Sequence, residues 1–283
     1  MRRALVLLVL LAPGPLAAQG IRFDAGAGVS SGTYLFEERT TTWSLSAGLA
    51  LEEGGFTLRG VVPFYYQNTT LVSGAGTGHI PTGGSSSGTV ADSGEARRHR
   101  GDGRMMPNLS HGSVEVPVSA VTGYEAAIGD PTVSLNWRRR GTGTTSFGLG
   151  GAVKIPVADT ATFGTGEWDL GVMAGVSHLL GGGFMLGLDL AYWRLGDLPD
   201  LELRDPAYGT ASLAYLSGGR WGATVLVSGG TAVLEGFDGP ASIGAGVHRL
   251  AGVSSWSVLS TVGLTETAPD LTVGLLWSVR LTR

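Results

Sequence analysis

Residues 43–51 read Trp-Ser-Leu-Ser-Ala-Gly-Leu-Ala-Leu. Large apolar side chains recur at Trp43, Leu45, Leu49 and Leu51, and the small Ala47 occupies the same phase. The intervening positions hold serine, glycine or alanine. A period of two is typical of a β-strand that has one apolar face and one polar or small face. The stretch therefore predicts a strand, and its repetition along the chain decides the fold.

The same alternation recurs along most of the 283 residues, in about 12 stretches. Most of them are about ten residues long, a length that suits a tilted crossing of a bilayer, whereas soluble strands usually have about five or six residues. The stretch at 207–216 alternates least regularly. The predicted strands cover residues 21–29, 43–51, 56–66, 133–137, 147–155, 168–176, 184–192, 207–216, 221–227, 243–247, 256–264 and 271–281.

Short and long connections alternate strictly between these strands. The short ones are glycine turns such as Glu53-Gly54-Gly55, where glycine permits the positive φ of a tight hairpin. The long ones fall at about 31–40, 67–128, 157–166, 195–206, 231–239 and 265–269. Outer-membrane barrels are laid out in this way, with the short turns in the periplasm. The sequence therefore predicts an all-β, transmembrane antiparallel barrel of about 12 strands, of the outer-membrane type, with both ends of the chain periplasmic.

Aromatic residues in the apolar phase fall near the ends of the predicted strands, as in the interfacial girdles of membrane barrels. Interfacial Trp and Tyr keep a ring in apolar surroundings while the polar atom reaches water or headgroups. The predicted loop-side girdle contains Trp43, Tyr66, Trp168 and Tyr192. The predicted turn-side girdle contains Trp137, Phe147, Phe184, Trp221, Trp256 and Trp277.

The first residues have the layout of a secretory signal. Met1-Arg2-Arg3 is a positive start, residues 4–12 are apolar, and Leu16-Ala17-Ala18 provides small residues for cleavage. About nine apolar residues are too few to span a bilayer as a helix. We therefore predict a signal peptide at residues 1–18, export to the outer membrane, and a single β-barrel domain at 19–283.

Composition excludes several functional classes. The 19 basic and 23 acidic residues give a net charge of −4, which does not indicate nucleic-acid binding. The absence of cysteine excludes disulfides and thiolate metal sites, and no His-Glu-x-x-His motif occurs. We expect no nucleic-acid partner, no cofactor and no metal.

The last predicted strand carries the pattern Thr272-x-Gly274-x-x-Trp277-x-Val279. It resembles the C-terminal signal by which the barrel-assembly machinery recognises outer-membrane barrels. Most such proteins end on a terminal aromatic residue, whereas this chain continues to Arg283. The resemblance implies that the assembly machinery is a partner.

Three segments resemble the family of outer-membrane transporters labelled "MetA-pathway of phenol degradation". They are Ile128-Gly129-Asp130, residues 150–156 (Gly-Gly-Ala-Val-Lys-Ile-Pro) and residues 164–169 (Gly-Thr-Gly-Glu-Trp-Asp). The family typically continues the proline with a Thr-Gly-Asp-like turn, and this chain has Val157-Ala158-Asp159 instead. The resemblance covers about residues 128–200 and implies transport, with hydrophobic or aromatic compounds as candidate solutes.

The polar phase of the strands predicts the lining of the lumen. It is rich in glycine, which leaves volume inside a small barrel and also permits strand curvature. Ionisable groups at membrane depth usually line a conduit or pair with one another. The predicted lumen-lining residues are Arg22, Asp24, Arg59, Arg138, Lys154, Asp189, Arg220, His248 and Arg280. We therefore expect a narrow channel for small solutes, whose identity the sequence leaves open.

The longest connection, at about 67–128, is expected to be extracellular and to fold over or into the mouth; a flexible surface loop is the alternative. Its arginines at 97–104 are candidates for contact with lipopolysaccharide phosphates. Outer-membrane lipid is the other expected partner, because it surrounds any membrane barrel. A solvated face is the alternative for this arginine run.

Two other functions stay open at this stage. One is a structural or adhesive barrel without a pore. The other is an outer-membrane lipid hydrolase, but neither Gly-x-Ser-x-Gly copy, at 28–32 and 84–88, enters a helix as a nucleophile elbow must. We therefore predict no catalytic residues.

Overall fold

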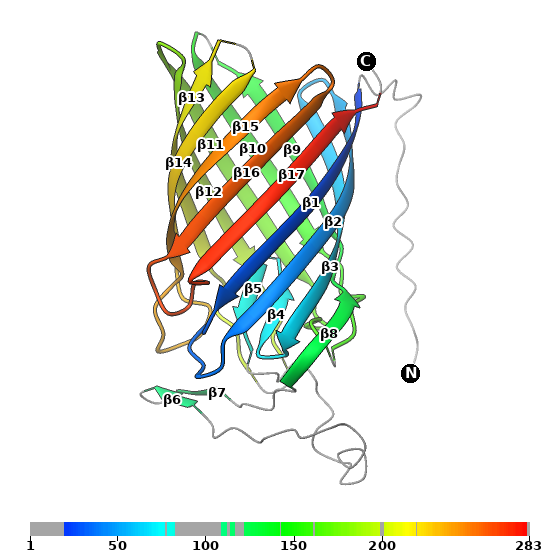
Figure 1. The fold of residues 1–283 in the computed structure, drawn as a ribbon, viewed down its shortest axis with the longest axis vertical. Coiled ribbons are helices and arrows are strands. Elements are labelled where there is room, and N and C mark those ends of the chain that lie inside the picture. The colour runs from blue at the N-terminus through cyan, green and yellow to red at the C-terminus, as the bar shows by residue number, and fades with distance from the viewer. Residues whose placement is uncertain are drawn as a thin grey trace.

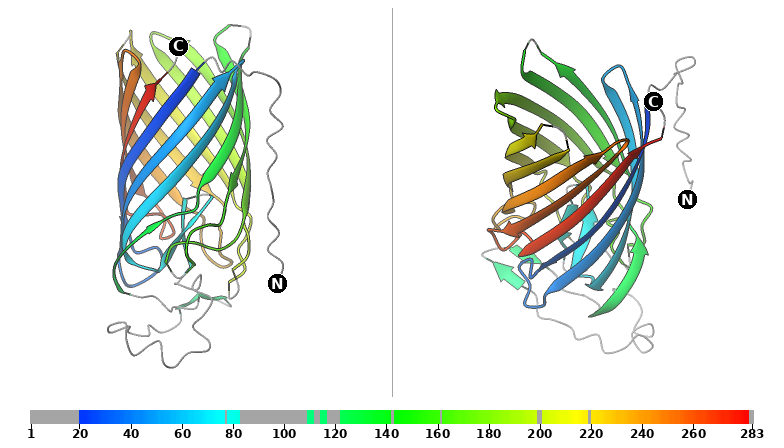
Figure 2. Two further views of the ribbon diagram at one scale, coloured as in Figure 1. Left: turned by 90° about the vertical axis from the view of Figure 1, so that its right-hand side faces the viewer. Right: turned by 45° about the horizontal axis from the view of Figure 1, so that its top comes forward.

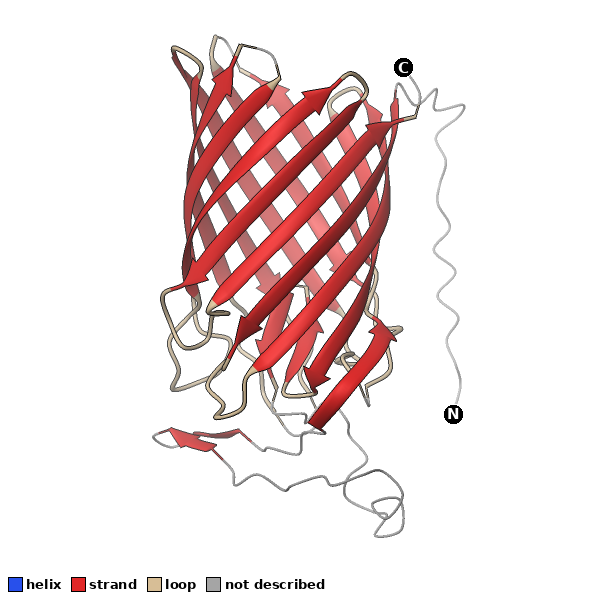
Figure 3. Cartoon of the chain, viewed as in Figure 1, coloured by secondary structure: helices blue, strands red, loops and turns tan. Residues whose placement is uncertain are grey.

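The computed structural model describes residues 20–76, 78–82, 109–111, 114–116, 122–141, 143–160, 162–198, 201–218 and 220–281. The predicted signal peptide and the arginine run at 97–104 lie outside these residues. Every described regular element is a β-strand (Figure 3). No helix in the described part of the chain has the length and apolarity needed to cross a membrane.

The strands fall into one large sheet and two small hairpins (Figure 1). The large sheet contains β1 Gly20–Gly32, β2 Thr40–Glu53, β3 Phe56–Thr69, β8 Thr122–Ile128, β9 Thr132–Arg140, β10 Thr145–Lys154, β11 Asp169–Gly181, β12 Phe184–Arg194, β13 Ala207–Ser217, β14 Trp221–Gly230, β15 Ala241–Ala251, β16 Ser254–Gly263 and β17 Leu271–Arg280. The hairpins are β4 Val72–Ala75 with β5 Gly78–Pro81, and β6 Leu109–His111 with β7 Val114–Val116.

The large sheet closes on itself. Neighbouring strands of the sheet pair antiparallel in chain order, except that β8 and β9 both pair with β3 and not with each other, and β1 pairs with both β2 and β17. The strand β3 pairs with β9 along its first half and with β8 beyond it, so β8 and β9 share one of the 12 positions around the barrel. The predicted fold class is confirmed, and the irregular stretch at 207–216 is indeed a strand, β13.

The β8 segment was expected inside the long loop. It is instead separated from β9 only by Gly129-Asp130-Pro131, where Gly129 N donates to Pro63 O at 2.9 Å. Alternation is weak in this segment, Thr-Gly-Tyr-Glu-Ala-Ala-Ile, because alanine and glycine occupy three of its seven positions. The sequence therefore gave little sign of it.

The barrel has two different ends (Figure 2). The turn end holds both ends of the described chain and tight hairpins such as that at Gly54 and Gly55, whose φ angles are +56° and +89°. The opposite, loop end holds the long connections and the β4–β5 hairpin (Figure 1). In the layout of outer-membrane barrels the turn end faces the periplasm and the loop end the outside.

The outer wall of the cylinder is apolar. Side chains such as Leu45, Leu149 and Val172 are more than half exposed there, as lipid-facing residues of a membrane barrel should be. The hydrophobic core lies at the loop end instead, where Tyr34, Leu71 and other buried side chains from separate connections pack together. The barrel is therefore held by its backbone ladder and capped by a compact apolar cluster.

Candidate functional site

The β4–β5 hairpin folds into the loop end of the barrel, and we call it the plug (Figure 1). Gln67, at the end of β3, turns the chain inward by donating from Nε2 to Thr69 O at 2.6 Å and to Val72 O at 2.9 Å. Leu71 and Val72 have no exposed surface. The plug is thus a packed element of the barrel mouth.

The tip of the plug is hydrogen-bonded to the start of β11 and to the loop before it. Gly76 N donates to Asp169 Oδ2 at 2.7 Å, and Gly74 N donates to Phe163 O at 2.9 Å. A Cβ placed on Gly76 would lie 2.2 Å from Cζ3 of Trp193, closer than any real contact. Only glycine fits at this position while the plug stays in place.

A buried ion cluster underlies this attachment. Lys154 Nζ lies 3.3 Å from Asp130 Oδ2 and 3.2 Å from Asp169 Oδ2, and the side chains of all three are at most 3% exposed. Lys154 also donates to Thr165, Asp130 Oδ1 accepts from the amides of Val157 and Ala158, and Asp169 Oδ1 accepts from the amide of Gly196. The cluster ties three strand ends, the following loop and the plug together.

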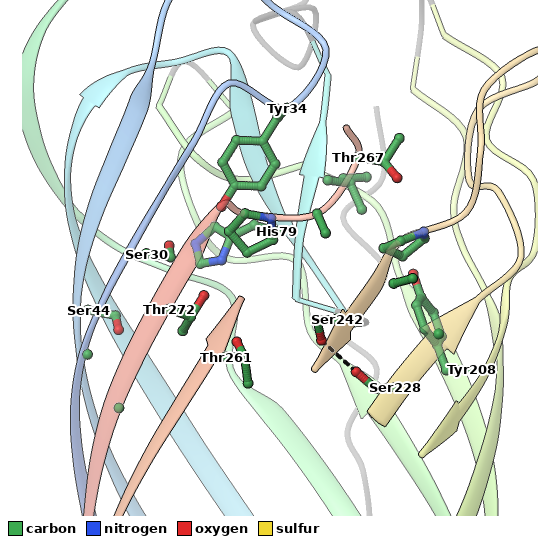
Figure 4. A pocket seen from close by; sticks show the side chains of 18 of the residues that line it. Ser30, Tyr34, Ser44, His79, Tyr208, Ser228, Ser242, Thr261, Thr267 and Thr272 are labelled. Atoms are coloured by element: carbon green, nitrogen blue, oxygen red, sulfur yellow. Dashed lines mark hydrogen bonds between the residues drawn. The ribbon is translucent and has the colours of Figure 1, made fainter. Parts of the chain in front are cut away.

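Behind the plug lies a cavity of about 710 Å³, which we call the chamber (Figure 4). Its wall combines aromatic side chains, among them Tyr34, Trp193 and Tyr208, with hydroxyl groups of serine and threonine. Ser228 and Ser242 share a hydrogen bond of 2.7 Å across two neighbouring strands (Figure 4). Among the described residues that line the chamber there is no lysine or arginine, and Asp238 is the only carboxylate. The chamber can accommodate an uncharged molecule with an apolar face and polar groups.

His79 of β5 lies at the chamber wall and packs edge-on against Tyr65, with ring centroids 5.0 Å apart. Burial lowers its pKa from 6.5 to about 4, so the imidazole is neutral at pH 7. Within the described part of the chain, its Nε2 has no hydrogen-bond partner. Burial also raises the pKa of the Tyr34 hydroxyl, so that group is neutral as well.

Acid is therefore expected to loosen the plug. The pKa of His79 is lower in the docked plug than in an undocked one, so lowering the pH from 6.5 towards 4 favours the undocked state, which binds the extra proton. In planar bilayers we expect a larger conductance at pH 4 than at pH 7, and His79→Asn should abolish much of that difference. An unchanged pH response in the variant would show that His79 is not the group responsible.

The lumen continues to the turn end through two further cavities. The middle one measures about 440 Å³, and its inner wall includes Gly148, Gly175 and Asp189. The one at the turn end measures about 930 Å³ and is lined by Arg22, Arg59, Arg138 and Arg280, among others. We call this last cavity the vestibule.

An ion-pair network crosses the wall of the vestibule. Asp24 is 4% exposed and accepts from Arg22 Nε at 3.0 Å, from Arg59 Nε at 2.8 Å and from Ser278 Oγ at 2.6 Å. Arg22 also pairs with Glu52. These contacts join β1, β2, β3 and β17 on the lumen side.

The predicted lumen residues lie at several places in the barrel. Arg22, Asp24, Arg59, Arg138 and Arg280 lie together at the vestibule, and Asp189 lies at the middle cavity. His248 covers Gly222, where a Cβ would lie 1.9 Å from its Nε2. Two differ from expectation: Lys154 is buried in the ion cluster, and Arg220 lies in the turn before β14.

The predicted girdle residues lie near the strand ends, on the outer phase. Tyr66 stacks on Tyr124 at the loop end, with centroids 4.7 Å apart. Trp256 stacks on Trp277 at the turn end, 5.6 Å apart. Trp43, Phe147, Trp168, Phe184, Tyr192 and Trp221 are exposed on the outside, and Trp137 is partly buried.

The residues of the predicted assembly signal lie along β17. Trp277 Nε1 donates to Ser254 Oγ at 2.7 Å, and Thr272 and Gly274 line the chamber. Val279 pairs with Phe23 on β1, next to the closing seam of the barrel.

The described residues show little that suggests hydrolysis or metal chemistry. His178 Nδ1 shares a 2.8 Å hydrogen bond with Thr145 Oγ1 in an exposed position, where no carboxylate is recorded beside it. Within the described ranges no group of three or more His, Asp or Glu side chains is placed to hold a metal ion.

The sequence predicted that the 67–128 connection folds over or into the mouth, but it predicted neither the β4–β5 hairpin that forms the plug nor the ion cluster. The plug has strands of only four residues, too short for alternation to stand out. The ion cluster joins Asp130, Lys154 and Asp169, which lie one in each of the three segments that resemble the transporter family. The presence of one charged residue in each of these segments was the sequence signal that could have pointed to the ion cluster.

Comparison with solved structures supports the fold. The chain is similar to the COG4313 outer membrane channel from Pseudomonas putida F1, with a TM-score of 0.66 and 11% identity over 94% of this chain and 97% of that one. It is also similar to the NanC porin, with a TM-score of 0.51 and 7% identity over 92% of this chain and 100% of the porin. No protein-family model matches the sequence, and no curated protein matches it significantly.

Proposed function

We propose that this protein is a channel of the outer membrane that passes small solutes through the barrel lumen. The observation that carries the proposal is the set of three cavities between the loop end and the turn end, whose walls contain many glycine, serine and threonine residues. Small barrels whose lumen is filled by large side chains cannot conduct, whereas glycine in the wall leaves space. The apolar outer wall and the similarity to two outer-membrane channels support the location.

We further propose hydrophobic or aromatic compounds as the solutes. The chamber supports this class because Tyr34, Trp193 and Tyr208 supply aromatic surface and its lining, within the described part of the chain, contains no lysine or arginine. The resemblance to the transporter family labelled "MetA-pathway of phenol degradation" points the same way. Liposome swelling with small aromatics, sugars and amino acids would rank these classes.

Blocking the middle of the lumen tests the channel. Gly148 lies in the wall of the middle cavity, and its nearest contact to an added Cβ is Trp137 O at 3.6 Å, so Gly148→Phe is tolerated by the wall and projects its ring into the lumen. We expect its conductance in planar bilayers to fall to a small fraction of that of the unmodified protein.

Gly60→Phe is the matched control. Gly60 occupies the outer phase of β3, and an added Cβ there meets nothing within 4 Å, so the ring enters lipid. Its conductance should be unchanged. Equal conductance in both variants, or none in the unmodified protein, would contradict the channel and favour a barrel without a pore, which the plugged mouth also permits.

A further inference from the structure

Four arginines from four strands face the vestibule. Arg22 on β1, Arg59 on β3, Arg138 on β9 and Arg280 on β17 all line the same cavity of about 930 Å³ at the turn end. All four share the lumen phase. Arg22 pairs in register with Arg280. On β3 and β9, the outward residues Phe56 and Leu58 pair with the outward residues Trp137 and Leu135, so Arg59 and Arg138 lie in the opposite, lumen phase. The vestibule therefore carries a cluster of cations on one side of the turn end, on strands that lie close together in the sheet.

The carboxylates at the vestibule do not balance the positive charge of the four arginines. Glu52 and Glu53 also line the vestibule, and Asp24 pairs with two of its arginines, so four cations against three anions leave an excess of one positive charge. Asp24 is almost fully buried and already accepts from two arginines and Ser278. Glu52 pairs closely with Arg22 and only at 3.8 Å with Arg280. The side chains that remain open to solute are mainly arginine.

Arg138 is the most available of them. No ion pair or hydrogen bond joins its guanidinium to the described part of the chain, and its side chain is exposed. It borders both the vestibule and the middle cavity, so a solute that leaves one for the other passes it. Asp189, which also borders the middle cavity, is the opposing charge further along the lumen.

We propose that the vestibule is an anion-binding site, with Arg138 at its inner edge, and that it makes the channel prefer small anions, including organic carboxylates, over cations. This inference rests on the proposed channel function. A fixed cation raises the local concentration of anions and excludes cations, and the walls of a narrow lumen of low dielectric constant strengthen the effect. A guanidinium also matches the planar geometry of a carboxylate.

The test is the reversal potential of the full-length protein in planar bilayers under a KCl gradient, and then under a gradient of potassium benzoate. We expect anion over cation permeability well above one for both salts. Arg138→Gln should lower the ratio by about twofold, as loss of one charge at several ångströms from the permeating ion in water implies. Asp189→Asn should raise it, because the variant removes an opposing charge.

Arg139→Gln is the matched control. Arg139 pairs in register with Phe147 on the outer phase, so its side chain points away from the lumen. Its substitution should leave the permeability ratio unchanged. A conducting channel that prefers cations, or one whose ratio responds equally to both arginine variants, would overturn the vestibule proposal and leave the channel intact. Absence of any conductance would instead overturn the channel itself.

Discussion

Lys154→Met is expected to destabilise the barrel by about 3–5 kcal/mol, the usual cost of removing one partner from a buried ion pair. The variant leaves Asp130 and Asp169 facing each other without a cation, and both are almost completely buried. Methionine keeps the length of the side chain, so the loss reflects charge and hydrogen bonding. Urea unfolding in lipid vesicles, followed by tryptophan fluorescence, measures the change.

Arg204→Met is the control for this variant. Arg204 and Glu235 form an ion pair of 2.7 Å at the loop end, but both side chains are more than half exposed. Exposed pairs contribute about 0–1 kcal/mol, so this variant should unfold close to the unmodified protein. Adding Asp130→Asn and Asp169→Asn to Lys154→Met should recover part of the loss, because the unpaired buried charges are then removed. Similar unfolding of Lys154→Met and Arg204→Met would show that the cluster is not a buried charge centre.

Gly76→Ala is expected to raise conductance severalfold by displacing the plug. The added methyl group would lie 2.2 Å from the Trp193 ring, so either the ring or the tip must move. Trp193 is 7% exposed and packed within the loop-end core, whereas the tip is held mainly by the hydrogen bonds from Gly74 N and Gly76 N. The tip therefore yields and opens the mouth.

The neighbouring Gly74→Ala provides a matched control on the same hairpin. A Cβ at Gly74 would meet its nearest atom, on Tyr65, at an ordinary 3.6 Å. Single-channel recordings of both variants and the unmodified protein make the comparison. If Gly76→Ala conducts like Gly74→Ala, the plug does not limit the current, and the narrowest point lies deeper in the lumen.

The cylinder could be predicted from the sequence because its rule is local. In β2, Trp43, Leu45 and Leu49 point to lipid and the residues between them to the lumen, so period, length and turn chemistry all carried the same information. The sequence places Arg22, Asp24 and Arg59 in the lumen phase for the same reason.

The plug and the ion cluster obey no local rule. Gly76 meets Asp169 across 93 positions of the chain, and no pattern near either residue predicts that contact. Lys154 sits in the polar phase of β10, which predicted a lumen residue, but the two carboxylates at neighbouring strand ends draw it into the wall. Alternation gives the phase of a residue along its strand, and only the tertiary fold gives its partners.

Because the hydrophobic core lies at the loop end, most of the residues that stabilise the entrance are separate from those that form the cylinder. Side chains such as Leu71, Ile80 and Leu234 stabilise the entrance without contributing to the ladder of the cylinder. Substitution in this cap is therefore expected to change the entrance while leaving the strand pairing of the cylinder in place.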